Sequence, residues 1–314
     1  MLPAVRPTIY FIGVTTKSSS IMKVFPKWAK ALGLENAVIK GVDLPLHAPT
    51  EDYRRVVAFL KEDPLSLGAL VTTHKIDLFN ACEDMFDEIY PFAEKLNEIS
   101  CLAKRDGKLC AQAKDPISSG LALESFVPEN FWKERGGEVV LLGAGGSSLA
   151  MTLYFAQESH GDNVPKKIII CNRSTPRLES AEKHLSYLSG RVNIEYVHCP
   201  TPADNDAVIA RLPQYSLVVN ATGLGKDAPG SPTTDNVKYS GNSLVWEINY
   251  RGDLIFMKQA LSQKEQNSLH VEDGWNYFIH GWTQVISEVF NVPIEGELLG
   301  KLSEIAKSAS NITS

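Results

Sequence analysis

A glycine cluster in the middle of the chain restricts the possible folds more than any other feature. The apolar run 139–142 stops at Gly143-Ala144-Gly145-Gly146-Ser147-Ser148, and an apolar, helix-like segment follows over 149–155. This is the order of a dinucleotide-binding strand, turn and helix, in which glycines permit a tight turn and a close backbone approach to a pyrophosphate. The helix amino terminus offers unpaired N–H groups to the phosphates. Ser148, at the third glycine position, is still small enough for close helix packing.

The position of this cluster also predicts how the chain is divided. A nucleotide-binding unit that begins near residue 139 implies another domain before it, and 314 residues are enough for two domains. We expect a substrate-binding catalytic domain over 1–116 and a Rossmann-type nucleotide domain over 117–272. Residues 273–314 are expected to form helices that pack back on the first domain. Their apolar residues recur at helical spacing: Trp275, Phe278, Ile279, Trp282, Val285, Ile286 and Val289.

Apolar periodicity indicates an α/β fold in both domains. In the first, the predicted strands are 8–14, 37–42, 68–71, 100–105 and 108–111, with helices at 21–34 and 50–61 and acidic helical segments up to Leu96. Asp106-Gly107 is a two-residue hairpin signal, so this sheet is expected to be mixed. After the polar break 133–137, strands are predicted at 138–142, 167–171, 193–198, 217–220 and 243–248, with a helix at 174–189. This alternation predicts a parallel, doubly wound sheet.

Composition excludes several classes of function. The net charge of −6 combines both signs, so no broad basic surface for nucleic acid is expected. No apolar run approaches the roughly 18–20 residues of a membrane span, and no signal peptide is recognisable. The five cysteines are scattered without C-x-x-C spacing. We therefore expect reduced thiols, a cytoplasmic location, and neither a disulfide framework nor a metal site.

The end of the second strand of the nucleotide domain indicates the cofactor. NAD-binding domains commonly carry an acidic residue there, whereas NADP-binding domains place an arginine near the 2′-phosphate. This strand runs into Asn172-Arg173-Ser174, and Arg177 follows within one helical turn. Guanidinium groups bind phosphate well, so NADP is the predicted cofactor. Alternatively, both arginines are solvated residues at a helix start, a place where the helix dipole disfavours positive charge.

Taken together, these motifs resemble the shikimate dehydrogenase family. In the nucleotide domain they are the glycine cluster, Asn172-Arg173-Ser174 and Asn220-Ala221-Thr222. Elsewhere they are Ser18-x-Ser20, Thr72-Thr73-His74-Lys75, the segment from Lys108 to Asp115, and Asp273-Gly274. The resemblance spans nearly the whole chain and keeps the order of the motifs.

The resemblance implies an NADP-dependent oxidoreductase of aromatic amino acid biosynthesis. Such an enzyme transfers hydride between NADP(H) and a carboxylated cyclic alcohol or its ketone, as in shikimate and 3-dehydroshikimate. Lys75 and Asp115 correspond to the catalytic pair. The lysine exchanges the hydroxyl proton, and the carboxylate orients the lysine and tunes its pKa. Taken alone, Lys75 could be a solvated lysine after a strand, and Asp115 a helix N-cap before Pro116.

The resemblance also implies two sets of binding residues. The substrate set is Ser18 and Ser20 for the carboxylate, with Thr72, Ser100 and Tyr250. The cofactor set comprises residues for the pyrophosphate, the 2′-phosphate and the nicotinamide, in that order: Gly143, Ala144, Gly145, Gly146, Ser147 and Ser148; Asn172, Arg173, Ser174 and Arg177; Thr222, Ile248 and Gly274.

Several substrate positions depart from the family pattern. The stretch 69–73 lacks the usual Asn and Pro before the lysine. Three further positions lack the family's amide side chains: Ser100, Ala113-Lys114 and Gly281. A site that pairs hydroxyl groups discriminates strongly when one partner is missing. We therefore expect the carboxylate clamp and the redox pair to persist and the polyol contacts to differ, with His74 and His280 as candidate replacements.

Two other functions stay open at this stage. One is an NAD-dependent quinate or other cyclic-alcohol dehydrogenase, and the other is a nucleotide-sensing homologue without catalysis. The expected partner is a small carboxylated cyclic alcohol, with no nucleic acid and no membrane. An exposed edge strand in the first domain would support a homodimer.

Overall fold

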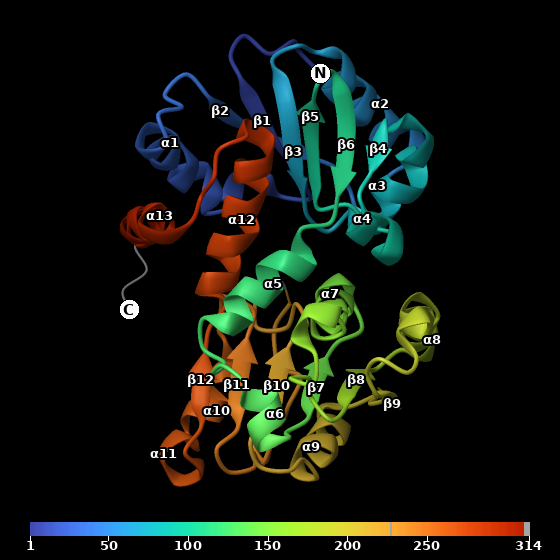
Figure 1. Ribbon diagram of the computed structural model, residues 1–314, viewed down its shortest axis with the longest axis vertical. Coiled ribbons are helices and arrows are strands. Elements are labelled where there is room, and N and C mark those ends of the chain that lie inside the picture. The colour runs from blue at the N-terminus through green and yellow to red at the C-terminus, as the bar shows by residue number, and fades with distance from the viewer. Residues whose placement is uncertain (227, 311–314) are drawn as a thin grey trace. The chain divides into compact units, whose positions relative to one another are not determined.

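The computed structural model describes residues 1–226 and 228–310. They form two compact units: unit 1, with residues 1–114 and 281–310, and unit 2, with residues 115–226 and 228–280. Each unit contains one six-stranded sheet (Figure 1). No helix within the described residues is long and apolar enough to cross a membrane.

Unit 1 is built on a mixed sheet, as the hairpin signal predicted. The order is β2 (Val38–Asp43), β1 (Thr8–Gly13), β3 (Ser66–Val71), β5 (Cys101–Arg105), β6 (Lys108–Gln112) and β4 (Glu88–Ile89). The first three strands are parallel, and β5 runs antiparallel to β3 and β6. Asp106 and Gly107 both have positive φ, which the tight β5–β6 turn requires.

Helices of unit 1 connect and cover this sheet: α1 (Ile21–Ala31), α2 (Thr50–Glu62), α3 (Lys75–Cys82) and α4 (Pro91–Leu96). The helix predicted over 21–34 ends at Ala31, because Gly33 adopts a left-handed conformation. The two-residue strand β4 lies inside a region expected to be helical. So short a strand carries too little periodicity to be recognised.

The last helices tie the end of the chain to unit 1. The helix α12 (Trp275–Phe290) contributes to both units, and α13 (Gly296–Ser310) lies in unit 1. The ring of Trp282 packs edge-on against Phe11 of β1, with centroids 5.0 Å apart. The buried indole of Trp28 donates a hydrogen bond to the Leu302 carbonyl at 2.7 Å, which joins α1 to α13.

Unit 2 is built on a wholly parallel sheet, which confirms the predicted doubly wound arrangement. The order is β12 (His270–Glu272), β11 (Leu244–Glu247), β10 (Leu217–Asn220), β7 (Val139–Leu142), β8 (Ile168–Asn172) and β9 (Ile194–His198). From β7 the chain adds β8 and β9 on one side and then β10 to β12 on the other. This switch point is where ligands bind in open α/β sheets, at the carboxyl ends of the strands.

Every residue of β7, β10 and β11 is buried, as expected for central strands with helices on both faces. The helices of unit 2 are α5 (Asp115–Glu124), α6 (Phe131–Arg135), α7 (Gly146–Phe155), α8 (Thr175–Leu185), α9 (Pro202–Ala210), α10 (Ile255–Leu261) and α11 (Lys264–Asn267). The helix predicted over 174–189 stops at Leu185, and a short 3₁₀ turn, Ser186–Leu188, follows.

A buried carboxylate links the ends of β10 and β11. Glu247 is 1% exposed. One carboxylate oxygen accepts the Asn220 side-chain amide at 2.6 Å, and the other accepts the side-chain and backbone N–H groups of Asn249 at 2.6 and 2.9 Å. Burial raises the pKa of Glu247 to about 7, although these amide donors oppose the rise. Asn220 in turn accepts hydrogen bonds from the Thr222 amide and hydroxyl.

Because of Glu247, the free energy of unfolding should fall as the pH rises towards neutrality. The pKa is raised above the ordinary value of 4.5, so the folded protein holds this proton more tightly than the unfolded chain. As pH rises from 4.5 to about 7, the unfolded chain loses the proton first, and the free energy of unfolding should fall. Over this range, the free energy of unfolding of wild type should fall by up to about 3 kcal/mol relative to that of Glu247→Gln.

Urea unfolding of both proteins across this pH range measures the difference. Glu179→Gln, at an exposed position on α8, is the matched control and should run parallel to wild type. Parallel curves for wild type and Glu247→Gln would contradict the effect of burial.

Candidate functional site

The predicted glycine turn joins β7 to α7. Gly143 has φ +112°, and a Cβ there would lie 2.9 Å from the Ala221 carbonyl oxygen, so no other residue fits without movement. Its N–H donates to the Cys171 carbonyl at 2.8 Å. Gly145 is the N-cap of α7, and a Cβ at that position would meet nothing within 4 Å. The turn therefore leaves open space in front of a helix amino terminus, as phosphate binding requires.

Ser148 stabilises this turn from inside. Its side chain is buried, and its hydroxyl donates to the Gly143 carbonyl at 2.6 Å. The serine at the third glycine position therefore does more than allow close packing. It fixes the backbone at the first glycine.

A pocket of about 540 Å³ lies at the carboxyl ends of β7, β8, β9 and β10. It brings together a set of predicted cofactor residues: Gly143, Ala144, Gly145, Asn172, Arg173, Ser174, Arg177 and Thr222. Three predicted neighbours, Gly146, Ser147 and Ser148, follow directly in α7 but do not line it. Ile248 and Gly274 are also outside the lining but lie together, because a Cβ on Gly274 would be 2.0 Å from the Ile248 carbonyl oxygen.

Sequence reasoning missed a second group of lining residues. They come from the connection between β9 and α9 and from the loop after β10: Cys199, Pro200, Thr201, Pro202, Asn205, Ala221, Gly223, Leu224, Ala228 and Pro232. One signal was present in the sequence. Thr201 and Asp204 have the spacing of a capping box, and they form it at the start of α9.

The two predicted phosphate ligands are available for binding. Arg173 and Arg177 are exposed at the pocket, and neither guanidinium has a hydrogen bond or ion pair with another described residue. The Asn172 side chain accepts the Ser174 amide at 2.9 Å, which shapes the turn that carries them. No carboxylate lines the pocket within the described parts of the chain. The pocket is therefore suited to an anion near its β8 side.

The predicted substrate residues of unit 1 occupy strand ends and turns. Ser18 ends a 3₁₀ turn, and its hydroxyl donates to the Thr15 carbonyl at 3.0 Å, while Ser20 immediately precedes α1. Thr72 follows β3, and its N–H donates to the Ile12 carbonyl. Lys75 is the first residue of α3.

The turn before Lys75 is strained. Thr73 has φ +57°, an unfavourable conformation for a β-branched residue. His74 is buried, and its Nδ1 lies 3.0 Å from the Tyr53 hydroxyl. That contact gives His74 a structural partner within unit 1. His280, the other candidate replacement, lies at the end of unit 2, where burial lowers its pKa.

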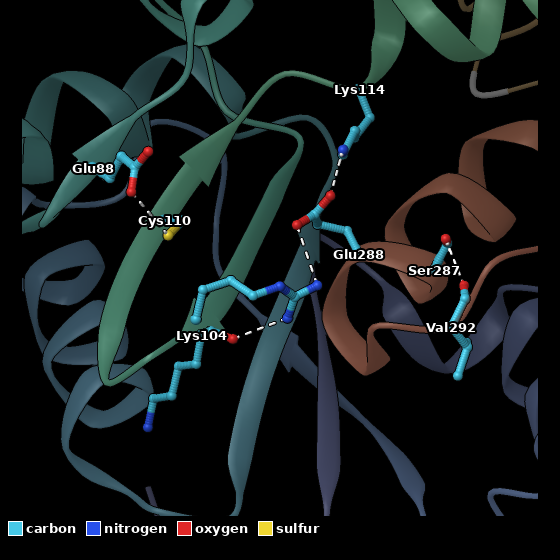
Figure 2. Close-up of polar contacts among 8 residues, drawn as sticks. Glu88, Lys104, Cys110, Lys114, Ser287, Glu288 and Val292 are labelled. Carbon is cyan, nitrogen blue, oxygen red and sulfur yellow. Dashed lines mark hydrogen bonds and ion pairs between the residues drawn. The ribbon is translucent and has the colours of Figure 1, made fainter.

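Lys114, one of the positions expected to differ from the family pattern, is held by an internal counter-ion. Its Nζ lies 2.8 Å from one oxygen of Glu288 (Figure 2). Arg105 reaches the other oxygen at 3.2 Å. Burial opposes ionisation of Glu288, but hydrogen bonds from Lys114 and Gln112, together with the charges of Lys114 and Arg105, outweigh it and lower the pKa. The Lys114 backbone N–H donates to the Ser100 hydroxyl at 2.7 Å. The added ammonium is therefore neutralised inside unit 1.

Asp115 and Tyr250 belong to unit 2. Asp115 is 8% exposed at the start of α5, and its carbonyl accepts the Ser119 hydroxyl at 2.7 Å. The Tyr250 ring packs against Phe278 and Trp275, with centroids 4.6 and 5.8 Å away. In residues 1–226 and 228–310, no group of three or more His, Cys, Asp or Glu side chains could hold a metal ion.

The sequence is similar to enzymes named shikimate dehydrogenase (NADP(+)), although no family model matches it. It is 24% identical to that of Lactococcus lactis over 165 residues, which is 52% of this chain and 54% of that enzyme. It is 23% identical to that of Bacillus cereus over 212 residues, or 67% of this chain and 68% of that enzyme. The chain thus matches about half to two thirds of the length of these curated relatives.

The fold matches solved structures over nearly the whole chain. Quinate dehydrogenase from Corynebacterium glutamicum in complex with NAD has a TM-score of 0.75 at 20% identity, covering 96% of this chain and 99% of that one. Shikimate 5-dehydrogenase from Thermus thermophilus in complex with NADP(H) and shikimate has a TM-score of 0.70 at 17% identity, with the same coverage. The 5-ketofructose reductase of a Gluconobacter species scores 0.68 at 17% identity, again over 96% and 99%. The sequence is thus similar to curated shikimate dehydrogenases, and the fold is the one seen in solved shikimate and quinate dehydrogenases.

Proposed function

We propose that this protein is an NADP-dependent dehydrogenase that interconverts a carboxylated cyclic alcohol and its ketone. The observation that carries the proposal is the pocket of unit 2. A glycine turn, an open helix amino terminus and two exposed arginines without partners among the described residues meet at the ends of parallel strands. The names of the curated relatives, and the NADP(H) and shikimate in the Thermus structure, support the same function.

The shape and charge of the pocket fit NADP. The pyrophosphate would lie against Gly143 to Ser148, where a side chain at Gly143 would collide with the backbone. The 2′-phosphate would lie beside Asn172, Arg173, Ser174 and Arg177, because guanidinium groups bind phosphate through paired hydrogen bonds. Thr222, Ile248 and Gly274 would line the nicotinamide side. Glu247 supports that wall through Asn220, which holds the Thr222 amide and hydroxyl.

A nicotinamide held beside Thr222, Ile248 and Gly274 would supply the hydride chemistry of the proposed reaction. Lys75 would take the proton from the substrate hydroxyl during oxidation and return it during reduction. Asp115 would orient the lysine and hydrogen-bond the same hydroxyl. Ser18 and Ser20 would bind the substrate carboxylate, with Thr72, Ser100 and Tyr250 as further contacts.

The substrate is proposed to have fewer recognised hydroxyls than shikimate. Ser100 and Gly281 lack the amides of the family pattern, and the Lys114 ammonium is bound to Glu288. The Ser100 hydroxyl accepts the Lys114 N–H, so it keeps its own proton for donation to a ligand. One donor in place of several amides should relax the preference for a triol.

A second candidate is an NAD-dependent quinate or other cyclic-alcohol dehydrogenase. The observation that favours it is the likeness to the Corynebacterium quinate dehydrogenase, which carries NAD. A non-catalytic nucleotide-sensing homologue is a third possibility, and the substituted substrate positions favour it. Cofactor preference and turnover separate these three functions.

Removing the charge of Arg173 tests the cofactor. Arg173→Gln should weaken NADP binding by roughly 10- to 100-fold, the usual effect of losing a hydrogen bond to a charged group. NAD has no 2′-phosphate, so its affinity should change little. Calorimetric titration with both cofactors measures this difference. Arg135→Gln is the control, because Arg135 stacks on Tyr215 and does not line the pocket. An equal loss for both cofactors, or tighter NAD binding by wild type, would overturn the NADP assignment.

Removing the Lys75 amine tests the reaction. Wild type should oxidise at least one compound from a panel of shikimate, quinate and simpler cyclic hydroxy acids, followed by the appearance of reduced nicotinamide. Lys75→Ala should lower kcat by roughly 10²- to 10⁴-fold and leave NADP affinity unchanged. Lys108→Ala, at an exposed position of the β5–β6 hairpin, is the control. A Lys75→Ala protein with wild-type turnover would contradict the assigned role. NADP binding without turnover of any panel member would favour the nucleotide-sensing homologue.

A further inference from the structure

Two cysteine thiols meet in the wall of the cofactor pocket. Cys171 is in β8 and Cys199 directly follows β9, and both line the pocket. Their side chains are 1% and 3% exposed. All five cysteines of the chain are free, and the other three, Cys82, Cys101 and Cys110, lie in unit 1.

The strand register accounts for this proximity. β8 and β9 are parallel, with Cys171 opposite Val197 and Asn172 opposite His198, so Cys199 is a diagonal neighbour of Cys171, two residues beyond its direct partner. The pairing continues one residue further, because the Cys199 N–H donates to the Asn172 carbonyl at 2.9 Å. Both side chains belong to the same core cluster, on one face of the sheet. The two thiols are close enough there to affect each other's ionisation.

The two thiols differ in acidity. The interaction with Cys171 lowers the pKa of Cys199 despite burial, and the same interaction raises the pKa of Cys171. Cys199 also precedes the amino terminus of α9, where a thiolate is favoured. By contrast, burial raises the pKa values of Cys82 and Cys101 to about 12. Cys199 is therefore suited to be the attacking sulfur.

We propose that Cys171 and Cys199 form an oxidisable dithiol, a modification site that controls access to the cofactor pocket. The oxidant would be a hydroperoxide. The Cys199 sulfur attacks the peroxide O–O bond and becomes a sulfenic acid, and one water leaves. The Cys171 sulfur then attacks the Cys199 sulfur, the S–O bond breaks, and a second water leaves. In balance, two thiols and one hydrogen peroxide give one disulfide and two waters.

The effect on the cofactor rests on the proposed function. Asn172 and Arg173 directly follow Cys171, and Pro200 and Thr201 directly follow Cys199. A disulfide would hold the two sulfurs at bonding distance and would pull these two walls together. The 2′-phosphate region should then narrow. A bound cofactor fills the pocket, so it should also protect the pair from oxidation.

Peptide mapping by mass spectrometry tests the dithiol without reference to activity. The full-length protein is treated with graded hydrogen peroxide, alkylated and digested. The expected product is a peptide pair joined through Cys171 and Cys199, with two hydrogens lost, while Cys101 stays reduced. Dithiothreitol should reverse the bond, and prior NADP should suppress it. Phenylarsine oxide, which bridges close thiols, should likewise modify this pair and no other.

Cofactor titration gives the second readout. Oxidised wild type should bind NADP at least about tenfold more weakly than reduced protein. Cys199→Ser and Cys171→Ser should be insensitive to peroxide, and Cys101→Ser should behave like wild type. The proposal is overturned if no linked peptide forms, if the arsenical does not bridge the pair, or if the linked protein binds NADP unchanged. If reduced wild type binds no NADP, the proposed function fails, whereas the linked peptide still decides the dithiol.

Discussion

The nucleotide unit depends on the contact of Gly143 with the ends of β8 and β10, the two strands that flank β7. Its N–H donates to the Cys171 carbonyl at the end of β8, and its α-carbon lies against the Ala221 carbonyl just after β10. A side chain there would separate β7 from β10, the two strands at the switch point of the sheet. Because the pocket is formed by the loops at these strand ends, one backbone contact sets the geometry of the turn, the helix amino terminus and the arginine-bearing loop together.

A second constraint lies one strand further along the sheet. Burying the Glu247 carboxylate opposes its ionisation, yet three amide N–H groups converge on it. Replacing this network with apolar residues could stabilise the sheet, as it often does for buried ionic groups. The arrangement instead fixes Asn220 and Asn249, and both hold the loop that carries Thr222. Burying the Glu247 carboxylate therefore costs folding free energy but fixes the pocket wall. Such a compromise is typical of functional sites.

The sequence was sufficient for the local part of this structure. The Gly143 turn, the Asp106-Gly107 hairpin and the alternation of strands in unit 2 depend on neighbouring residues, so local patterns predicted them. The wall formed by Cys199 and Pro200 could not be predicted in this way, because it reaches the pocket through the register between β8 and β9. Lys114 is a stronger example. Its counter-ion Glu288 lies 174 residues away, and no local pattern indicates that pairing.

The same distinction limits what a motif can say about specificity. By residue type alone, Lys114 adds a positive charge to the predicted substrate set and would suggest a more acidic ligand. The ion pair with Glu288 neutralises that charge, and Arg105 binds the same carboxylate. At this position the fold therefore provides an ionic contact within unit 1. The chemistry of the ligand therefore depends on the groups that stay unpaired after folding. Among the described residues, the guanidinium groups of Arg173 and Arg177 have no partner, whereas the Lys114 ammonium is paired.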